Sequence, residues 1–126
     1  MSDPTKFAEP VTSFDVHIYF FQGSERSVQS AARLREEILQ TFPDFEVYKL
    51  HTTPIGPHPT GMFEVDLRTP QQFAQLVPWL VTRRGEHSVL IHPHTGDGLR
   101  DHTVNAIWLG DKVPLILDVL RPRTQQ

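Results

Sequence analysis

The order of its hydrophobic patterns restricts most strongly what this chain can fold into. Four short segments have the pattern of strands with a buried face: residues 14–20, 45–50, 62–67 and 88–92. Apolar residues recur instead at helical spacing over residues 24–41 and again over residues 69–84. The predicted order is therefore strand, helix, strand, strand, helix, strand.

This order is that of the α+β ferredoxin-like split-βαβ fold, an antiparallel sheet with two helices on one face. We expect the other face of the sheet to be open, which would suit a cleft or a dimer contact. A C-terminal extension follows, with a short extra strand at 104–109 and a strand or short helix at 113–120. A chain of 126 residues suits one domain, predicted here as residues 12–126 after a flexible leader at 1–11.

Turn and cap residues support the two helices. Ser24 is a good N-cap for the first helix, and Pro43 ends it. The second helix begins well, with Thr69 at the N-cap and proline directly after it. Pro78 lies inside that helix, and we expect it to kink or shorten the helix.

Composition excludes several classes of protein. The chain has no cysteine, which rules out disulfides and thiolate metal sites. Its twelve Lys and Arg residues are scattered and the net charge is −3, so we expect no nucleic-acid partner. No apolar run reaches the roughly 20 residues that span a bilayer, and the N-terminal residues do not resemble a secretory signal. We therefore expect a soluble cytoplasmic protein.

Seven histidines are the chemically distinctive residues of the chain. If the first strand is central, His17, Glu64 and His92 project from adjacent strands on the open face. Two imidazoles and one carboxylate are the ligand set of a facial non-haem Fe(II) site. Each residue alone has a simpler interpretation as a packed or solvated side chain, and this holds above all for Glu64.

The other histidines lie in predicted loops or at strand ends. His58 stands between two prolines, where a rigid loop suits a metal ligand or a general acid/base, although a surface turn is the simpler interpretation. His94 could be a second ligand or a substrate contact, and His102 is a candidate proton shuttle. We expect His51 and His87 to be ordinary surface residues.

Several motifs, taken in order, resemble the DOPA 4,5-dioxygenase family of fungi and bacteria. They are FDVHIYF at 14–20, GPHPTGMFE at 56–64, PWL at 78–80, RGEHSVLIHPHT at 84–95 and DHTVNAIWLG at 101–110. The resemblance covers roughly residues 14–115. It implies an extradiol ring-cleaving dioxygenase with a ferredoxin-like fold, often dimeric, that opens a catechol such as L-DOPA. The family's characteristic histidines fall on His17, His58, His92, His94 and His102.

This resemblance leads to a specific hypothesis. Fe(II), or alternatively Zn(II), is held by His17, His92 and a third ligand, either His58 or Glu64. The ion takes the catechol oxygens and O₂, and His102 or His94 acts catalytically by moving protons.

Some features of the hypothesis stay open. Arg84 or Arg100 could pair with a substrate carboxylate. The alternative functions are a non-catalytic domain that binds a small aromatic, and a Zn-dependent enzyme on the same scaffold.

Overall fold

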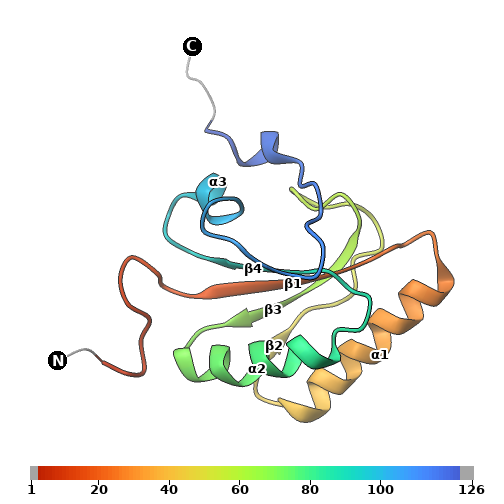
Figure 1. The fold of residues 1–126 in the computed structure, drawn as a ribbon, viewed down its shortest axis with the longest axis horizontal. Coiled ribbons are helices and arrows are strands. Elements are labelled where there is room, and N and C mark those ends of the chain that lie inside the picture. The colour runs from red at the N-terminus through yellow and green to blue at the C-terminus, as the bar shows by residue number, and fades with distance from the viewer. Residues whose placement is uncertain (1–2, 123–126) are drawn as a thin grey trace.

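The computed structural model of the chain describes residues 3–122 and confirms the predicted α+β order (Figure 1). The elements, in chain order, are β1 (Phe14–Phe20), α1 (Glu25–Thr41), β2 (Glu46–Val47), β3 (Gly61–Leu67), α2 (Pro70–Arg83), β4 (Val89–Pro93), α3 (Gly98–Asp101), β5 (Ile107–Leu109) and the 3₁₀ helix η1 (Leu117–Leu120).

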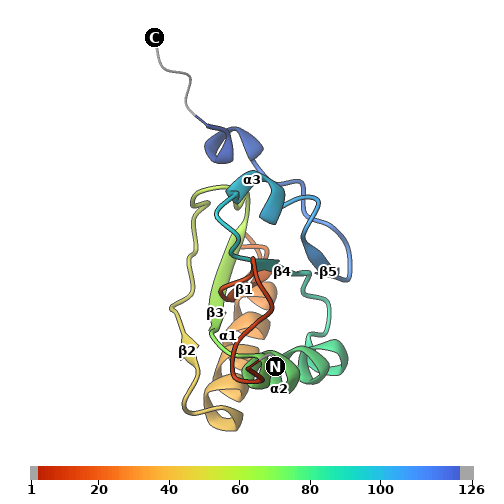
Figure 2. The same ribbon diagram turned by 90° about the vertical axis from the view of Figure 1, so that its left-hand side faces the viewer.

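The sheet has five strands in the order β2-β3-β1-β4-β5, and all neighbouring strands are antiparallel. As expected, β1 lies centrally between β3 and β4, while β2 and β5 form the edges (Figure 2). His17 of β1 is directly opposite Glu64 of β3, and Asp15 of β1 is opposite His92 of β4. The register therefore brings the predicted site residues onto adjacent strands.

Helices α1 and α2 cover one face of the sheet and enclose the main core (Figure 1). The fully buried members of this core that come from the strands alternate along them, as predicted: Val16, Ile18, Phe63, Val65, Leu67, Val89 and Ile91. Ser24 and Thr69 cap the two helices, and their side chains accept hydrogen bonds from the backbone N–H groups of Ser27 and Gln72. Pro78 lies inside α2 without ending it.

The second face of the sheet is covered, contrary to the expectation of an open face. The C-terminal extension folds back over it, so that α3 and η1 lie on the opposite side of the sheet from α1 and α2 (Figure 1). Tyr19, Met62 and Leu90 are buried there as a second apolar cluster, packed against Trp108 and Leu115 among others. The apolar side chains of the extension leave water when they pack on this face of the sheet, which favours the covered arrangement over an open one.

Two further segments differ from the prediction. The strand expected at 45–50 is reduced to β2, although the chain still follows β3: the Tyr48 N–H donates to the Glu64 carbonyl, and His51 pairs with Met62. The loop expected at 93–103 contains the short helix α3, which Asp97 caps. Short irregular segments such as these are fixed by contacts with the rest of the fold and not by periodicity.

The N-terminal leader is packed in part. The ring of Phe7 lies 5.2 Å from that of Phe14 and 6.4 Å from that of Phe73, between centroids. Thr12 and His94 extend the β1–β4 pairing through the Thr12 N–H, which donates to the His94 carbonyl. Within residues 3–122, no helix combines the length and the apolar content required to cross a membrane.

Gly61 provides a test of the packing at the start of β3. A Cβ atom there would lie 2.5 and 2.7 Å from ring atoms of the buried Phe20 and 3.0 Å from the His51 carbonyl oxygen. We expect Gly61→Ala to lower the free energy of unfolding by about 1–3 kcal/mol in urea denaturation, because the core cannot yield. Gly23→Ala is the control, since nothing lies within 4 Å of its Cβ position. Equal stability of the two variants would contradict this account of the core.

Candidate metal centre

His17 and His92 form a buried pair on the second face of the sheet. Their Nε2 atoms are 3.1 Å apart, and the two rings are nearly parallel, with an interplanar angle of 14°. Each side chain projects from a strand in the middle of the sheet, and each residue is only 2% exposed. The backbone of two paired strands therefore holds both nitrogens in place.

Carbonyl oxygens set the tautomers of His92 and His102. Nδ1 of His92 lies 3.1 Å from the Pro93 carbonyl oxygen, and Nδ1 of His102 lies 2.7 Å from that of Gly98. A carbonyl only accepts hydrogen bonds, so each Nδ1 carries the hydrogen and each Nε2 keeps its lone pair. This second partner for a histidine is typical of metal ligands, because it orients the ring.

His17, His92 and His102 converge closely enough to hold a metal ion. One ring nitrogen from each lies within 4.8 Å of the others. Two imidazole nitrogens bound at right angles, each about 2.1 Å from an ion, would be about 3.0 Å apart. His17 Nε2 and His92 Nε2 are hydrogen-bonded at 3.1 Å in the structure, a separation that also suits two ligands of one ion.

The other nitrogen of His17 is a buried polar atom without a partner. His17 Nδ1 makes no hydrogen bond among the described residues, and the Glu64 Oε1 atom faces it at 3.9 Å. A cation on Nε2 would place the ring hydrogen on Nδ1, directed at that carboxyl group. Burial raises the pKa of Glu64 to about 9, because desolvation disfavours the ionised carboxylate. The unpartnered Nδ1 atom and the carboxyl group that faces it fit a cation bound at Nε2 of His17.

Burial also keeps the histidines neutral, which metal binding requires. Desolvation, followed by the neighbouring His102, lowers the pKa of His92 to about 4. Burial likewise lowers the pKa of His17 well below its ordinary value, and it lowers the pKa of His102. Their lone pairs are therefore available near neutral pH.

Asp15 provides a carboxylate at the edge of the same group. Its Oδ2 atom is 2.9 Å from His94 Nε2 and 3.7 Å from His92 Nε2. Asp15 also belongs to two further sets that could hold an ion, one with His92 and His94 and one with His17 and Glu64. His94 thus lies beside the centre and orients Asp15.

His58 lies against this group, held from a different loop. Its ring centroid is 4.2 Å from that of His17, and its Nδ1 is 2.7 Å from the hydroxyl of Tyr19. Among the described residues, no set of three that could hold an ion includes His58. Burial lowers the pKa of His58 to about 4, so its ring is also neutral near pH 7. A fixed neutral imidazole beside a metal centre can accept a proton from a bound ligand.

A hollow of about 390 Å³, which we call the slot, opens beside His102. Its lining residues are His102, Thr103, Val104, Trp108, Lys112, Val113, Leu115 and Leu117. Trp108 stacks on Tyr19, with centroids 5.9 Å apart and an interplanar angle of 22°. A larger hollow of about 790 Å³ also touches Lys112 and Val113, so residues 112–113 lie between the two. The slot has the walls and size to hold one aromatic ring.

The structure also shows where three other residues considered in the sequence analysis lie. His87 is buried and not a surface residue, since its Nδ1 lies 2.8 Å from the Tyr19 carbonyl oxygen and its Nε2 lies 2.9 Å from the Ser30 hydroxyl. Neither Arg84 nor Arg100 is among the described residues that line the slot. Arg84 instead donates to the His87 carbonyl.

Two residues of the candidate site, Tyr19 and Trp108, were not predicted from the sequence. Tyr19 shares its predicted sheet face with His17, so the alternation of β1 contained the signal for it. Trp108 had no comparable signal, because its position depends on how the C-terminal extension folds back.

The geometry predicts which histidines matter for metal binding. We expect His92→Ala or His102→Ala to weaken the binding of Fe(II) or Zn(II) at least tenfold, measured by calorimetric titration, because each removes one of three converging nitrogens. His51→Ala is the matched control, since His51 belongs to none of the sets that could hold an ion. The assignment fails if His58→Ala abolishes binding while His102→Ala leaves it unchanged.

Comparisons with known proteins show which proteins this chain resembles. A 21.2 kDa uncharacterised protein of Botryotinia fuckeliana is 45% identical over 133 residues, covering 96% of this chain and 73% of the relative. The DOPA 4,5-dioxygenase of Amanita muscaria is 33% identical over 112 residues, covering 85% of this chain and 49% of that protein, so the chain spans about half of its length.

A crystal structure from Nostoc punctiforme, described as a candidate dioxygenase, superposes with a TM-score of 0.79 at 38% identity. The match covers 88% of this chain and 92% of that chain. The family model for the Dopa 4,5-dioxygenase family matches residues 14–119, a span that contains all the histidines of the centre. The chain therefore belongs to the Dopa 4,5-dioxygenase family.

Proposed function

We propose that the protein is an Fe(II)-dependent extradiol dioxygenase that opens the ring of a catechol. The observation that carries this proposal is the convergence of His17, His92 and His102 beside a slot that is large enough for one aromatic ring. In the reaction, a carbon–carbon bond next to a hydroxylated carbon breaks and both atoms of O₂ enter the product. The catechol supplies the electrons that reduce O₂, so no external reductant is required.

The donor set is suitable for iron. Imidazole nitrogens bind Fe(II) well, and a facial set of three protein ligands leaves positions free for other molecules. His17, His92 and His102 would hold the ion, and Glu64 would orient His17 through Nδ1. Fe(II) bound there would supply the place at which the catechol oxygens and O₂ meet. Compared with our expectation from the sequence, His102 changes from proton shuttle to ligand, and Glu64 from ligand to orienting residue.

His58 is the residue that would take a proton from the catechol hydroxyl. It is neutral, it lies against His17, and Tyr19 fixes its ring through a hydrogen bond of 2.7 Å. Two prolines flank it, and the Ile116 N–H ties the Pro57 carbonyl to the C-terminal extension at 2.8 Å. A base held so firmly needs little reorganisation when the substrate binds.

The slot would hold the aromatic ring and keep water away from it. Trp108 forms one wall, and its stacking on Tyr19 prevents it from rotating freely. The remaining walls are mainly aliphatic, from Val104, Val113 and Leu115 among others. A planar ring can therefore enter between flat and apolar surfaces.

Oxygen uptake tests the proposal directly. The protein, loaded with Fe(II) under nitrogen, should consume O₂ when 4-methylcatechol or L-DOPA is added and should form a yellow ring-opened product. Mass spectrometry after reaction under ¹⁸O₂ should show both labelled atoms in that product. His92→Ala should abolish uptake, whereas His51→Ala should not.

Two results would count against an iron dioxygenase. One is stoichiometric Fe(II) binding without O₂ uptake for any catechol tested. The other is equal turnover of an aromatic substrate by the Zn(II)-loaded protein under nitrogen, which would favour the zinc enzyme considered above.

Tyr19→Phe tests the role of the hydroxyl group behind His58. The ring and its stacking on Trp108 are kept, and one hydrogen bond worth about 0.5–1.5 kcal/mol is lost. We expect kcat to fall roughly threefold to tenfold, because His58 is less well oriented, while the affinity for Fe(II) stays within twofold. Steady-state oxygen uptake and metal titration provide the two measurements.

A double variant shows whether Tyr19 acts through His58. In a His58→Gln background, Tyr19→Phe should cause no further loss of kcat, since the residue that it orients is absent. Additive losses in the double variant would show that Tyr19 supports the site in another way.

A further inference from the structure

The charges around the slot are strongly one-sided. Of the residues that line it, Thr103, Trp108 and the aliphatic side chains carry no charge, and His102 belongs to the candidate metal centre. Lys112 is therefore the one fixed charge among the described lining residues, and no described Asp or Glu lines the slot. A ligand in this slot would therefore meet the ammonium group of Lys112, the candidate metal centre at His102 and otherwise mainly apolar surface.

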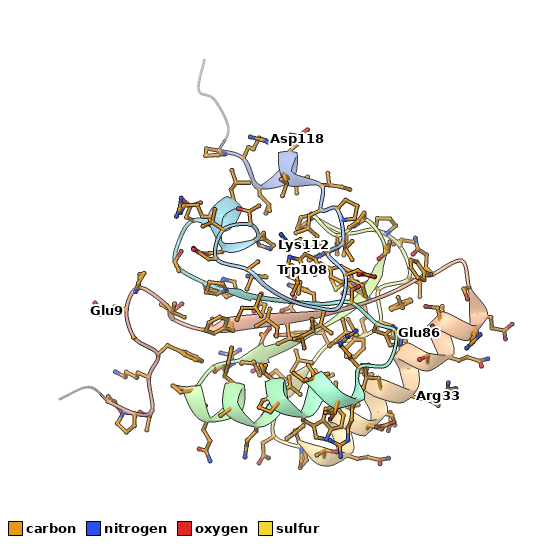
Figure 3. The ribbon with its side chains drawn as sticks, viewed as in Figure 1. Glu9, Arg33, Glu86, Trp108, Lys112 and Asp118 are labelled. Carbon is orange, nitrogen blue, oxygen red and sulfur yellow. The ribbon has the colours of Figure 1, made fainter. Side chains whose placement is uncertain are left out.

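Lys112 is exposed and therefore available to a ligand. Among residues 3–122 it takes part in no ion pair. It follows Gly110, whose φ of 78° only glycine adopts easily and whose Cα faces the Arg84 guanidinium. Arg84 in turn donates to the carbonyl of His87, two residues before β4 begins. Figure 3 shows Trp108 and Lys112 on the side of the sheet away from α1 and α2.

We propose that Lys112 is a specificity-determining residue and that the preferred substrates are catechols whose ring substituent ends in a carboxylate without an ammonium group. This inference rests on the proposed function for the identity of the ring and deepens it for the substituent. With the ring against Trp108, a carboxylate on a short side chain would pair with the ammonium group of Lys112 at the rim.

An amino group on the same side chain works against binding. It would lie near Lys112, where like charges repel, and the described lining residues offer no carboxylate to compensate. The nearest acidic residues that line a hollow, Asp111 and Glu86, line the larger hollow beyond residues 112–113. We therefore expect carboxylates to bind best, neutral catechols less well, and amino-acid or amine catechols least well.

Binding can be measured without turnover by using phenols, which lack the second hydroxyl group. Four compounds carry the same two-carbon unit on the phenol ring and differ in the charged groups attached to it: 3-(4-hydroxyphenyl)propanoate, 4-ethylphenol, L-tyrosine and tyramine. Calorimetric titration of the Fe(II)-loaded protein under nitrogen should give the lowest Kd for the propanoate. L-Tyrosine should bind several-fold more weakly than the propanoate, although both carry the carboxylate.

Variants of Lys112 test whether this residue causes the preference for a carboxylate. Lys112→Met should raise the Kd of the propanoate about threefold to tenfold, as expected for a partly exposed ion pair, and should change that of 4-ethylphenol less than twofold. Lys112→Glu should reverse the order, so that tyramine binds better than the propanoate. Lys49→Met is the matched control at the opposite edge of the sheet, and it should change no Kd.

The corresponding catechols extend the test to catalysis. The kcat/KM for 3-(3,4-dihydroxyphenyl)propanoate should exceed that for L-DOPA, and Lys112→Met should remove most of the difference between the propanoate and 4-ethylcatechol. An unchanged order of Kd values in Lys112→Met, equal losses for all four phenols, or no binding of any phenol would each overturn the inference.

The two proposals fail in different ways. Charge-selective binding through Lys112 without oxygen uptake would refute the dioxygenase and leave the binding preference intact. Oxygen uptake that is indifferent to substituent charge would refute the role of Lys112 and leave the dioxygenase intact.

Discussion

The structure depends above all on the pairing of β1 between β3 and β4. Side chains alternate along a strand, so a register that buries Val16 and Ile18 against the helices necessarily places His17 on the other face. A slip of one residue would exchange the two faces, exposing the core and burying the wrong side chains. Hydrophobic packing on one face therefore fixes the position of the candidate metal ligand His17 on the other.

For this reason, the part of the site that lies in strands could be predicted from the sequence. Alternation in residues 14–20 and 88–92 placed His17 and His92 on one face, and their Nε2 atoms are 3.1 Å apart in the structure. The central position of the first strand followed from the order of the elements. Periodic patterns contain this information because they record which face of each strand is buried.

The loops and the C-terminal extension could not be derived in the same way. Asp101 is buried and accepts hydrogen bonds from Thr95 and Asn105, and this network fixes the turn that brings His102 to His92. The sequence showed only an aspartate next to a histidine, without the partners that give the pair its geometry. The cover over the second face likewise depends on contacts between residues far apart in sequence, such as Ile116 with Pro57.

The C-terminal extension that covers the second face shields the candidate centre from water and also changes its chemistry. On an open face the imidazoles would titrate near pH 6.5, and protons would compete with a metal ion in mildly acidic solution. Burial lowers the pKa of His92 to about 4, which keeps its lone pair free at neutral pH. The same cover brings Trp108 and Lys112 beside the centre. Under the proposed function, the sheet would thus supply a fixed pair of ligands, while the C-terminal extension would supply the third ligand, the low polarity and the selectivity, so that substrate preference could change without altering the paired strands.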